Sequence, residues 1–237
     1  MRYVLFGGVP VSLFPDLRSV AAPPSIDLRC CDVREMLASV RGARLIVADP
    51  PWQYNNAGVR GNADSEYGLI TDSDIVEILN SSFDSAAPDS RLAVWYTWPK
   101  DAEWNAAGGA GPRWGARTTG GAWTKIGTCG VGWHWRGFTE PVALFTRGSP
   151  GRCREVLLNG HVSPPSDHSE KPAAWMRQWI EAWTDPGDLV VDVFAGLAPL
   201  ARACALTGRR YVGAEIDPDR HAMALTRLAA AISRGDL

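Results

Sequence analysis

The sequence predicts an α/β domain with a doubly wound, mostly parallel sheet that is covered by helices on both faces. Short apolar runs alternate with segments of helical periodicity, which is the pattern of repeated β–α units. Several runs are apolar almost throughout, as expected of strands buried on both faces. The 237 residues, 46% of them hydrophobic, suffice to bury one large core. We therefore predict one domain over residues 26–237, preceded by an unassigned segment, residues 1–25, that forms a hairpin or a tail.

Each predicted strand is a short apolar run bounded by polar or turn-forming residues. In chain order these are residues 26–31, 44–48, 91–96, 122–126, 142–146, 189–193 and 210–214. The predicted helices are residues 73–79 behind a capping Asp72 or Thr71, residues 171–183 with Pro172 in the first turn, residues 198–206, and residues 218–232 behind a capping Asp217. Residues 55–67 and 106–121 are polar or rich in glycine, and we expect surface loops that carry recognition.

Composition and simple motifs argue against several classes of protein. No apolar run approaches the roughly 18 residues that a membrane-spanning helix needs. The five cysteines are odd in number and lack the paired spacing of a zinc site, so we predict no metal centre and a reduced, cytoplasmic setting. No G-x-G-x-x-G follows a strand, which disfavours an NAD-dependent dehydrogenase. The absence of a Pro-Cys pair removes the usual nucleophile for methylating a ring carbon of cytosine.

The sharpest motif is Asp49-Pro50-Pro51-Trp52, which directly follows the apolar strand at residues 44–48. An acid at the carboxyl end of a parallel strand stands where α/β folds bind ligands. Two prolines keep the backbone extended and remove amide donors, so the Asp49 and Pro50 carbonyls can face a ligand.

These residue types suit methyl transfer to the exocyclic amine of an aromatic base. The Asp49 carboxylate and the Pro50 carbonyl would accept hydrogen bonds from the amine, and Trp52 would offer a face on which an extruded base stacks. A carboxylate also suits a positively charged sulfonium donor. The alternative is a strand that ends in an ordinary Asp-Pro turn.

A second motif runs from Leu189 through Asp192 to Gly196, where a strand enters a small-residue turn and then a helix. Such a turn brings backbone amides and a positive helix end to a ligand. About twenty residues further on, the next strand ends in Glu215, the spacing at which an acid grips ribose hydroxyls in nucleotide-binding folds. Asp192 would then hold the ammonium of the donor's methionine. A purely structural strand–turn–helix is the alternative.

The net charge of -2 gives no global attraction to a polyanion, so any nucleic-acid surface must be local. Basic groups hold phosphates, and aromatic rings stack bases. The candidate surface interleaves the two types: Arg113, Arg117, Lys125 and Arg136 with Trp114, Trp123, Trp133 and Trp135. The alternative is that these tryptophans fill the core.

Taken together, the motifs resemble those of the permuted N6-adenine methyltransferases, in which the DPPW or DPPY stretch precedes the donor-binding F-x-G stretch. The chain also resembles the eukaryotic messenger-RNA adenosine methylase family and its bacterial and phage relatives. The resemblance spans about residues 32–219. It rests on Asp49 to Trp52, Trp95-Tyr96-Thr97, Trp123-Thr124-Lys125, Gly132 with Arg136, Glu140, Leu144 and Arg147-Gly148, His168 to Pro172, Asp192 to Gly196, and Glu215.

The resemblance implies a circularly permuted, Rossmann-like fold that binds S-adenosylmethionine. It places Lys171 and His168 near the donor's carboxylate and Asp32 near its adenine, although a helix-initial Lys and a capping Asp are the simpler explanations. The implied donor site comprises Asp32, His168, Lys171, Asp192, Phe194, Ala195, Gly196 and Glu215. Ala198 and Pro199 replace the second glycine and the hydroxyl residue of the relatives' F-x-G-x-G-[ST], which predicts a changed turn and weaker donor binding.

The function that we predict from the sequence is transfer of a methyl group from S-adenosylmethionine to N6 of adenine in DNA. Adenosine methylation in RNA is the main alternative, and a catalytically silent nucleic-acid-binding subunit is another. Methylation of cytosine's amine is disfavoured because those relatives usually carry Ser at the position of Asp49. Sequence recognition would lie in the two loops, in a homodimer or in a second subunit.

Overall fold

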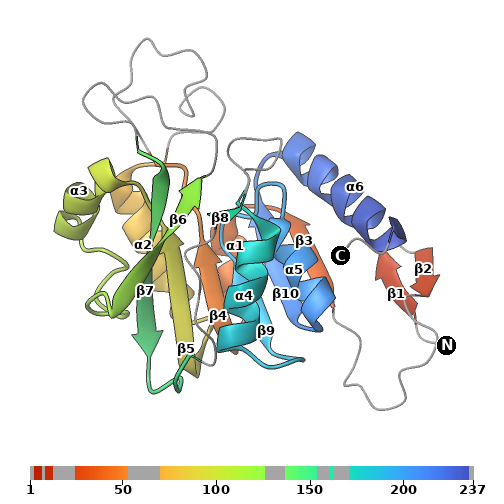
Figure 1. The fold of residues 1–237 in the computed structure, drawn as a ribbon, viewed down its shortest axis with the longest axis horizontal. Coiled ribbons are helices and arrows are strands. Elements are labelled where there is room, and N and C mark those ends of the chain that lie inside the picture. The colour runs from red at the N-terminus through yellow and green to blue at the C-terminus, as the bar shows by residue number, and fades with distance from the viewer. Residues whose placement is uncertain are drawn as a thin grey trace, which may run out of the picture.

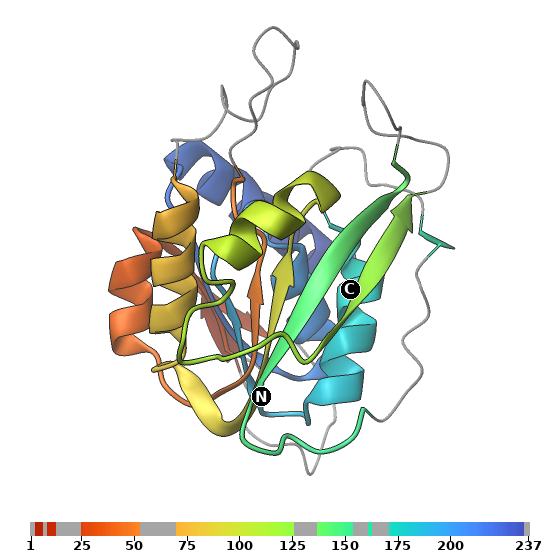
Figure 2. The same cartoon turned by 90° about the vertical axis from the view of Figure 1, so that its left-hand side faces the viewer.

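In the computed structural model of the chain, an eight-stranded sheet lies between two layers of helices (Figures 1 and 2). The structure describes residues 25–52, 70–125, 137–153 and 171–234, and the backbone of the short strands at residues 3–6, 9–12 and 161–162. The strands of the sheet are β3 (Ile26–Cys30), β4 (Ala43–Ala48), β5 (Ala86–Trp95), β6 (Thr119–Lys125), β7 (Thr139–Arg147), β8 (His161–Val162), β9 (Leu189–Asp192) and β10 (Arg210–Glu215).

The strand order is β3-β10-β9-β4-β5-β7-β6-β8, and β7 alone among these strands runs antiparallel to the rest. The expected mostly parallel α/β sheet is therefore confirmed. The last two strands of the chain, β9 and β10, lie inside the sheet between β3 and β4. Segments far apart in the sequence thus become neighbours near the sheet's centre.

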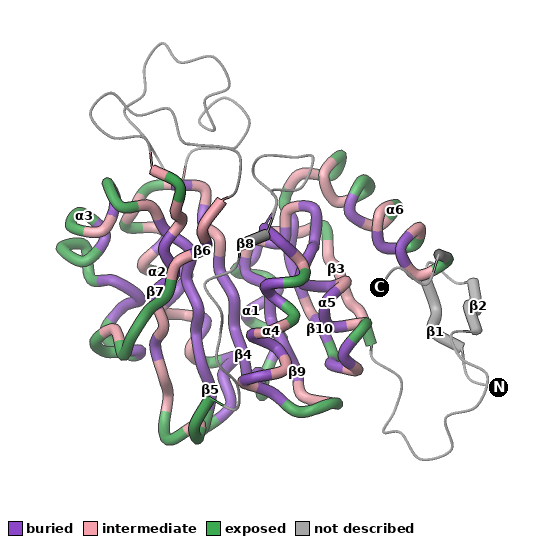
Figure 3. The backbone as a smooth tube through the Cα atoms, viewed as in Figure 1, coloured by how far each residue is buried: buried purple, intermediate pink, exposed green. Residues whose placement is uncertain are grey.

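Helices cover both faces because side chains of the central strands alternate between two apolar cores. Ile46 of β4 packs on the face of α1, α2 and α3, whereas Val47 packs on the face of α4, α5 and α6. Figure 3 shows the central strands as largely buried. The helices are α1 (Val33–Ser39), α2 (Asp72–Ser82), α3 (Asp101–Ala106), α4 (Ala173–Trp183), α5 (Pro199–Thr207) and α6 (Pro218–Arg234), with a 3-10 turn, η2, at Trp98–Lys100.

All seven predicted strands are present, with shifted ends. β5 begins five residues before its predicted start, where Pro88 and Asp89 interrupt the apolar pattern. Neither α1 nor α3 was predicted, and both are shorter than eight residues. Residues 3–6 and 9–12 form the antiparallel pair β1 (Tyr3–Phe6) and β2 (Val9–Ser12), which is the hairpin alternative for the N-terminal segment.

The two predicted loops have different outcomes. Residues 55–67 lie outside the described residues. Residues 106–121 form turns up to residue 118, but β6 already begins at Thr119, so the end of the predicted loop is strand. Across the described helices, none is both long enough and apolar enough to cross a lipid bilayer.

The connections around β4 and β9 create a crevice at the carboxyl edge of the sheet. These adjacent parallel strands lead to helices on opposite faces: β4 continues towards α2 and β9 towards α5. In open α/β sheets, ligands bind at such a switch point. Asp49 follows β4 and Asp192 ends β9, so both predicted motifs reach the crevice.

Candidate active site

A pocket of about 690 Å³ opens at this edge of the sheet. Its wall contains both the Asp49 stretch and the Asp192 stretch, which lie more than 130 residues apart in sequence but converge here. The predicted residues that line it are Asp32, Asp49, Pro50, Pro51, Trp52, Lys171, Asp192, Phe194, Ala195, Gly196 and Glu215. His168 and Arg136 lie outside the described residues. Arg113, Arg117 and Lys125 are described, but they are not part of the wall.

A row of four alternating charges runs from the pocket wall along the sheet edge. Nζ of Lys171 lies 2.6 Å from Oδ2 of Asp49 and 3.3 Å from Oε2 of Glu140. Glu140 also pairs with Lys125. Of the four residues, Glu140 had been noted only as part of the resemblance. No short sequence motif predicts the row, because its members come from different segments. They lie directly after β4, at the end of β6, at the start of β7 and just before α4.

Opposite charges within the row act against the effects of burial on its pKa values. Burial raises the pKa of Asp49, and the adjacent Lys171 ammonium acts against that rise. Burial alone would lower the pKa of Lys171, but Asp49 and Glu140 together hold it above its usual value. Burial would likewise raise the pKa of Glu140, yet Lys171 and Lys125 keep it below its usual value. The ammonium groups of Lys171 and Lys125 also lie 5.1 Å from the rings of Trp95 and Trp123, respectively.

The structure gives the Pro50 carbonyl and the Trp52 side chain hydrogen-bond partners within the protein. The Pro50 carbonyl accepts a hydrogen bond of 2.8 Å from the Trp52 amide, so part of its hydrogen-bonding capacity is already used. The Trp52 side chain is only 4% exposed: Nε1 donates to the Trp95 carbonyl at 2.9 Å, and the ring meets Trp104 edge to face. Trp52 therefore anchors the loop in the core. Its role as a stacking face stays a prediction.

Lys171 lines the pocket, and its ammonium is buried between Asp49 and Glu140. It stands two residues before the first residue of α4, outside the helix that was predicted to begin with it. Pro172 is the residue before that helix rather than part of its first turn. Contact between Lys171 and a donor stays a prediction.

At the other end of the pocket, backbone amides hold the carboxylate of Glu215. Its Oε2 accepts a hydrogen bond from the Gly196 amide, and its Oε1 accepts one from the Asp217 amide, both at 2.9 Å. Asp217 in turn caps α6 by accepting from the Asp219 amide, as predicted. The strand end, the glycine turn and the start of α6 are thus fixed to one another through a single acidic side chain.

Asp192 is the deeply buried carboxylate of the site. It is 4% exposed, and the Tyr211 hydroxyl donates to its Oδ2 at 3.1 Å. Burial raises its pKa to about 7, and the negative charges of Asp49 and Glu215 act in the same direction, while the Tyr211 hydroxyl opposes the rise. Three carboxylates therefore influence one another around this pocket.

The turn after β9 contains a residue with an unusual backbone conformation. Ala198 has a φ of 53°, in the left-handed region that alanine rarely adopts, and Pro199 begins α5. Such a conformation costs a non-glycine residue about 1–2 kcal/mol. The Ala198 amide donates to the Ala195 carbonyl at 2.7 Å and closes the turn. The predicted effect on donor binding stays a prediction.

Asp32 caps a helix and also lines the pocket. Its Oδ1 caps α1 by accepting from the Arg34 amide at 2.7 Å, and its side chain also belongs to the pocket wall. Within the described part of the chain, no cluster of His, Cys, Asp or Glu side chains could hold a metal ion.

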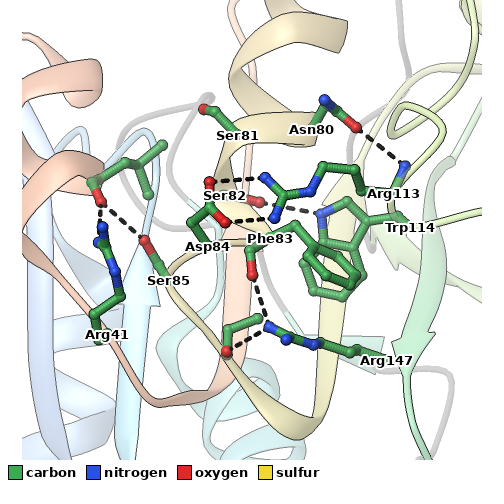
Figure 4. A network of polar contacts seen from close by, with 12 residues as sticks. Arg41, Asn80, Ser81, Ser82, Phe83, Asp84, Ser85, Arg113, Trp114 and Arg147 are labelled. Carbon is green, nitrogen blue, oxygen red and sulfur yellow. Dashed lines mark hydrogen bonds and ion pairs between the residues drawn. The ribbon is translucent and has the colours of Figure 1, made fainter.

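The predicted basic surface does not form one patch. Arg113 pairs with Asp84, just after α2, and its guanidinium lies 4.7 Å from the Phe83 ring (Figure 4). This is the edge where β5 begins, opposite the pocket. Arg117 instead donates to Asp101 at 2.7 Å and to the Tyr96 hydroxyl at 3.1 Å, on the pocket side.

Arg113 and Arg117 thus pair with carboxylates of different segments, and their role in nucleic-acid binding stays a prediction. Trp114 and Trp123 are 4% and 1% exposed, which confirms the core interpretation for these two rings. Trp133 and Trp135, the other two rings of the candidate surface, lie outside the described residues.

Comparisons with known proteins agree with this geometry. A family model described as "DNA methylase" matches residues 143–226, about a third of the chain. The DNA adenine methyltransferase YhdJ of Escherichia coli strain K12 is 36% identical over 75 residues, which cover 32% of this chain and 24% of YhdJ. The alignments span less than half the length of the curated relatives that the chain matches.

Solved structures resemble the chain over most of its length. The complex of M1.HpyAVI with S-adenosylmethionine has a TM-score of 0.65 at 16% identity, over 86% of this chain and 99% of that one. The cytosine-N4-specific PvuII DNA methyltransferase has a TM-score of 0.65 at 15% identity, over 91% and 96% of the two chains. The chain therefore shares its fold with these two DNA methyltransferases.

Proposed function

We propose that the chain is a DNA methyltransferase that transfers the methyl group of S-adenosylmethionine to the exocyclic N6 amine of adenine. The observation that carries the proposal is the convergence of the Asp49 stretch and the Asp192–Gly196 turn on one pocket. The matched family, the adenine-modifying relative and the methyltransferase fold support the same reaction class.

The described residues fit such a donor. S-adenosylmethionine supplies an electrophilic methyl group on a sulfonium and also carries an ammonium, and the pocket presents Asp49, Asp192 and Glu215 to positive charge. We assign the donor's ribose hydroxyls to Glu215, whose carboxylate is held in place by the Gly196 and Asp217 amides. A carboxylate oxygen that accepts one amide hydrogen bond retains capacity for another.

The acceptor end fits an aromatic amine. Oδ2 of Asp49 is engaged by Lys171, so we assign the amine hydrogen to Oδ1 of the same carboxylate. Lys171 helps to keep Asp49 ionised in its buried setting, and an ionised carboxylate stabilises the positive charge that develops on the amine nitrogen during transfer. The remaining acceptor capacity of the Pro50 carbonyl would hold the second amine hydrogen.

Asp49 favours adenine over cytosine, because the cytosine-amine enzymes that the sequence resembles usually carry Ser at this position. A cytosine-N4 enzyme nevertheless shares the fold, so the product must be identified directly. The test is incubation of the purified protein with labelled donor and either duplex DNA or structured RNA, followed by identification of the modified nucleoside. We expect N6-methyladenine in DNA.

Each of the other possible results would overturn one part of the proposal. N4-methylcytosine would overturn the choice of base, and N6-methyladenosine confined to RNA would overturn the choice of nucleic acid. Donor binding without any methylated product would favour the silent-subunit alternative.

A further inference from the structure

One tryptophan at the pocket edge is exposed, unlike most of the others. The Trp98 side chain is 56% exposed, and Trp98 directly follows Tyr96 and Thr97, which line the pocket. Exposure alone needs no explanation, but the place of Trp98 beside the pocket makes its ring a candidate contact for a planar ligand. Seven other tryptophans are buried: Trp52, Trp95, Trp104, Trp114, Trp123, Trp175 and Trp179.

The ring of Trp98 is held in place despite its exposure. Its Nε1 donates a hydrogen bond of 3.0 Å to Oγ1 of Thr139, the first residue of β7. Thr139 therefore fixes one edge of the indole at the start of β7. The polar edge of the indole is thereby anchored to the protein, and its ring retains exposed surface.

Trp98 also ends a row of aromatic contacts that starts in the Asp-Pro-Pro-Trp stretch. Ring centroids lie 5.4 Å apart from Trp52 to Trp104, 5.4 Å from Trp104 to Tyr96, and 6.2 Å from Tyr96 to Trp98. The row connects the buried loop beside Asp49 with the surface. A nucleotide next to a base in the pocket would meet its outer end.

The charges around Trp98 favour stacking over phosphate contact. Arg117 pairs with Asp101 at 2.7 Å, and Lys100 pairs with Asp72 at 3.0 Å. These cations are compensated by carboxylates, so the surface offers aromatic rings rather than net positive charge. A neutral, planar partner suits it best.

We propose that Trp98 forms a stacking platform for a base that flanks the target adenine in DNA. The proposal rests on the function proposed above and extends it to a residue outside the pocket. Base–aromatic stacking contributes about 1–3 kcal/mol per base, which corresponds to about 5- to 150-fold in affinity. Because the interaction involves no phosphate, its loss should leave the salt dependence of binding unchanged.

The test measures binding of DNA oligonucleotides to the parent protein and to Trp98→Ala, Trp98→Phe and Leu206→Ala. Leu206 is an exposed apolar residue of α5 and serves as the matched control. We expect Trp98→Ala to weaken binding 5- to 150-fold without changing the salt slope or the affinity for S-adenosylmethionine. Trp98→Phe should recover most of the loss, and Leu206→Ala should bind like the parent.

A second measurement addresses which base is stacked. Oligonucleotides with an abasic site on either side of the target should lose affinity for the parent, and this loss should disappear in Trp98→Ala, because the two changes remove the same contact. Fully additive losses would overturn the platform. Parent-like DNA binding by Trp98→Ala would also overturn the platform. The same holds if that variant changes self-association but not DNA binding.

The readouts separate this inference from the proposed function. If Trp98 stacks on DNA but the parent protein yields no methylated base, the proposed function alone is overturned. Normal methylation with parent-like binding by Trp98→Ala would overturn the platform alone. A parent that binds no DNA would overturn both.

Discussion

The two ends of the pocket are built in different ways. At the donor end, Glu215 accepts hydrogen bonds from the amides of Gly196 and Asp217, which lie 19 and 2 residues away in sequence. At the acceptor end, Asp49 is held by Lys171, 122 residues away, and the row continues through Glu140 to Lys125. Backbone fixes the first end, whereas a balance of side-chain charges fixes the second. We therefore expect donor binding and turnover to respond separately to mutation.

The largest expected effect is on turnover at the acceptor end. Asp49→Asn removes the carboxylate that holds the amine, and losses of this kind typically reach about 10²- to 10⁴-fold in rate. Donor affinity, measured by calorimetry, should stay within about threefold of the parent. A variant with near-normal methylation of DNA would remove Asp49 from the mechanism, and with it the contrast between the two ends.

Glu215→Ala should lower donor affinity more than turnover. Loss of a charge-assisted pair of hydrogen bonds should weaken binding of S-adenosylmethionine by about 2–3 kcal/mol, or about 30- to 150-fold. At saturating donor, turnover should fall much less than in Asp49→Asn. Glu181→Ala is a suitable control, because it removes only an ion pair with Arg177 at the surface of α4. Unchanged donor affinity in Glu215→Ala would refute the ribose assignment.

Asp192 makes the donor end depend on pH. Because the folded protein raises its pKa to about 7, the folded state binds more protons than the unfolded state between the usual range of an aspartate and pH 7. Its contribution to stability is therefore present at low pH and is lost as the pH rises towards 7. Donor binding should show the reverse trend, since only the ionised carboxylate attracts an ammonium.

We expect donor affinity to fall up to tenfold per pH unit below about 7, as measured by calorimetry between pH 5 and 8. Tyr211→Phe removes the hydrogen bond that opposes the raised pKa and should move the transition to higher pH. Asp192→Asn should bind weakly and without this transition. A transition that survives in Asp192→Asn would assign the pH dependence to another group.

The smallest expected effect concerns the turn at Ala198. Ala198→Gly relieves the left-handed conformation but makes the unfolded chain more flexible, so the two terms partly cancel. We expect a net gain of about 0.5 kcal/mol in the free energy of unfolding, measured by denaturant titration. Donor affinity should improve by less than threefold, and a larger gain would show that the turn limits donor binding.

The contrast between the ends also explains what the sequence could predict. The strand–turn–acid pattern of the donor end is local, so spacing alone located Asp192, Gly196 and Glu215 on one pocket wall. Asp49 was found in the same way, from its place after a buried strand. The partner of Asp49 could not be read from the sequence, because Lys171 lies 122 residues away and meets it only through tertiary packing.

The basic residues show a different limit of reasoning from sequence spacing. Arg113 and Arg117 are four positions apart, and closeness in sequence suggested a shared surface. The irregular chain between them turns across the sheet, so one side chain meets Asp84 and the other meets Asp101. Outside helices and strands, the spacing of two residues does not predict where their side chains point. The exposure of Trp98 was equally hidden, because its neighbour Trp95 is buried.

The strand order has a consequence for how the protein is made. β3 pairs in the sheet with β10, which is synthesised about 180 residues after it. β4 likewise obtains one of its two neighbours, β9, only late in synthesis. The N-terminal half therefore carries unpaired strand edges while translation proceeds, and such edges are prone to aggregation. Premature termination before β9 would release a chain with neither a complete sheet nor the donor end of the pocket.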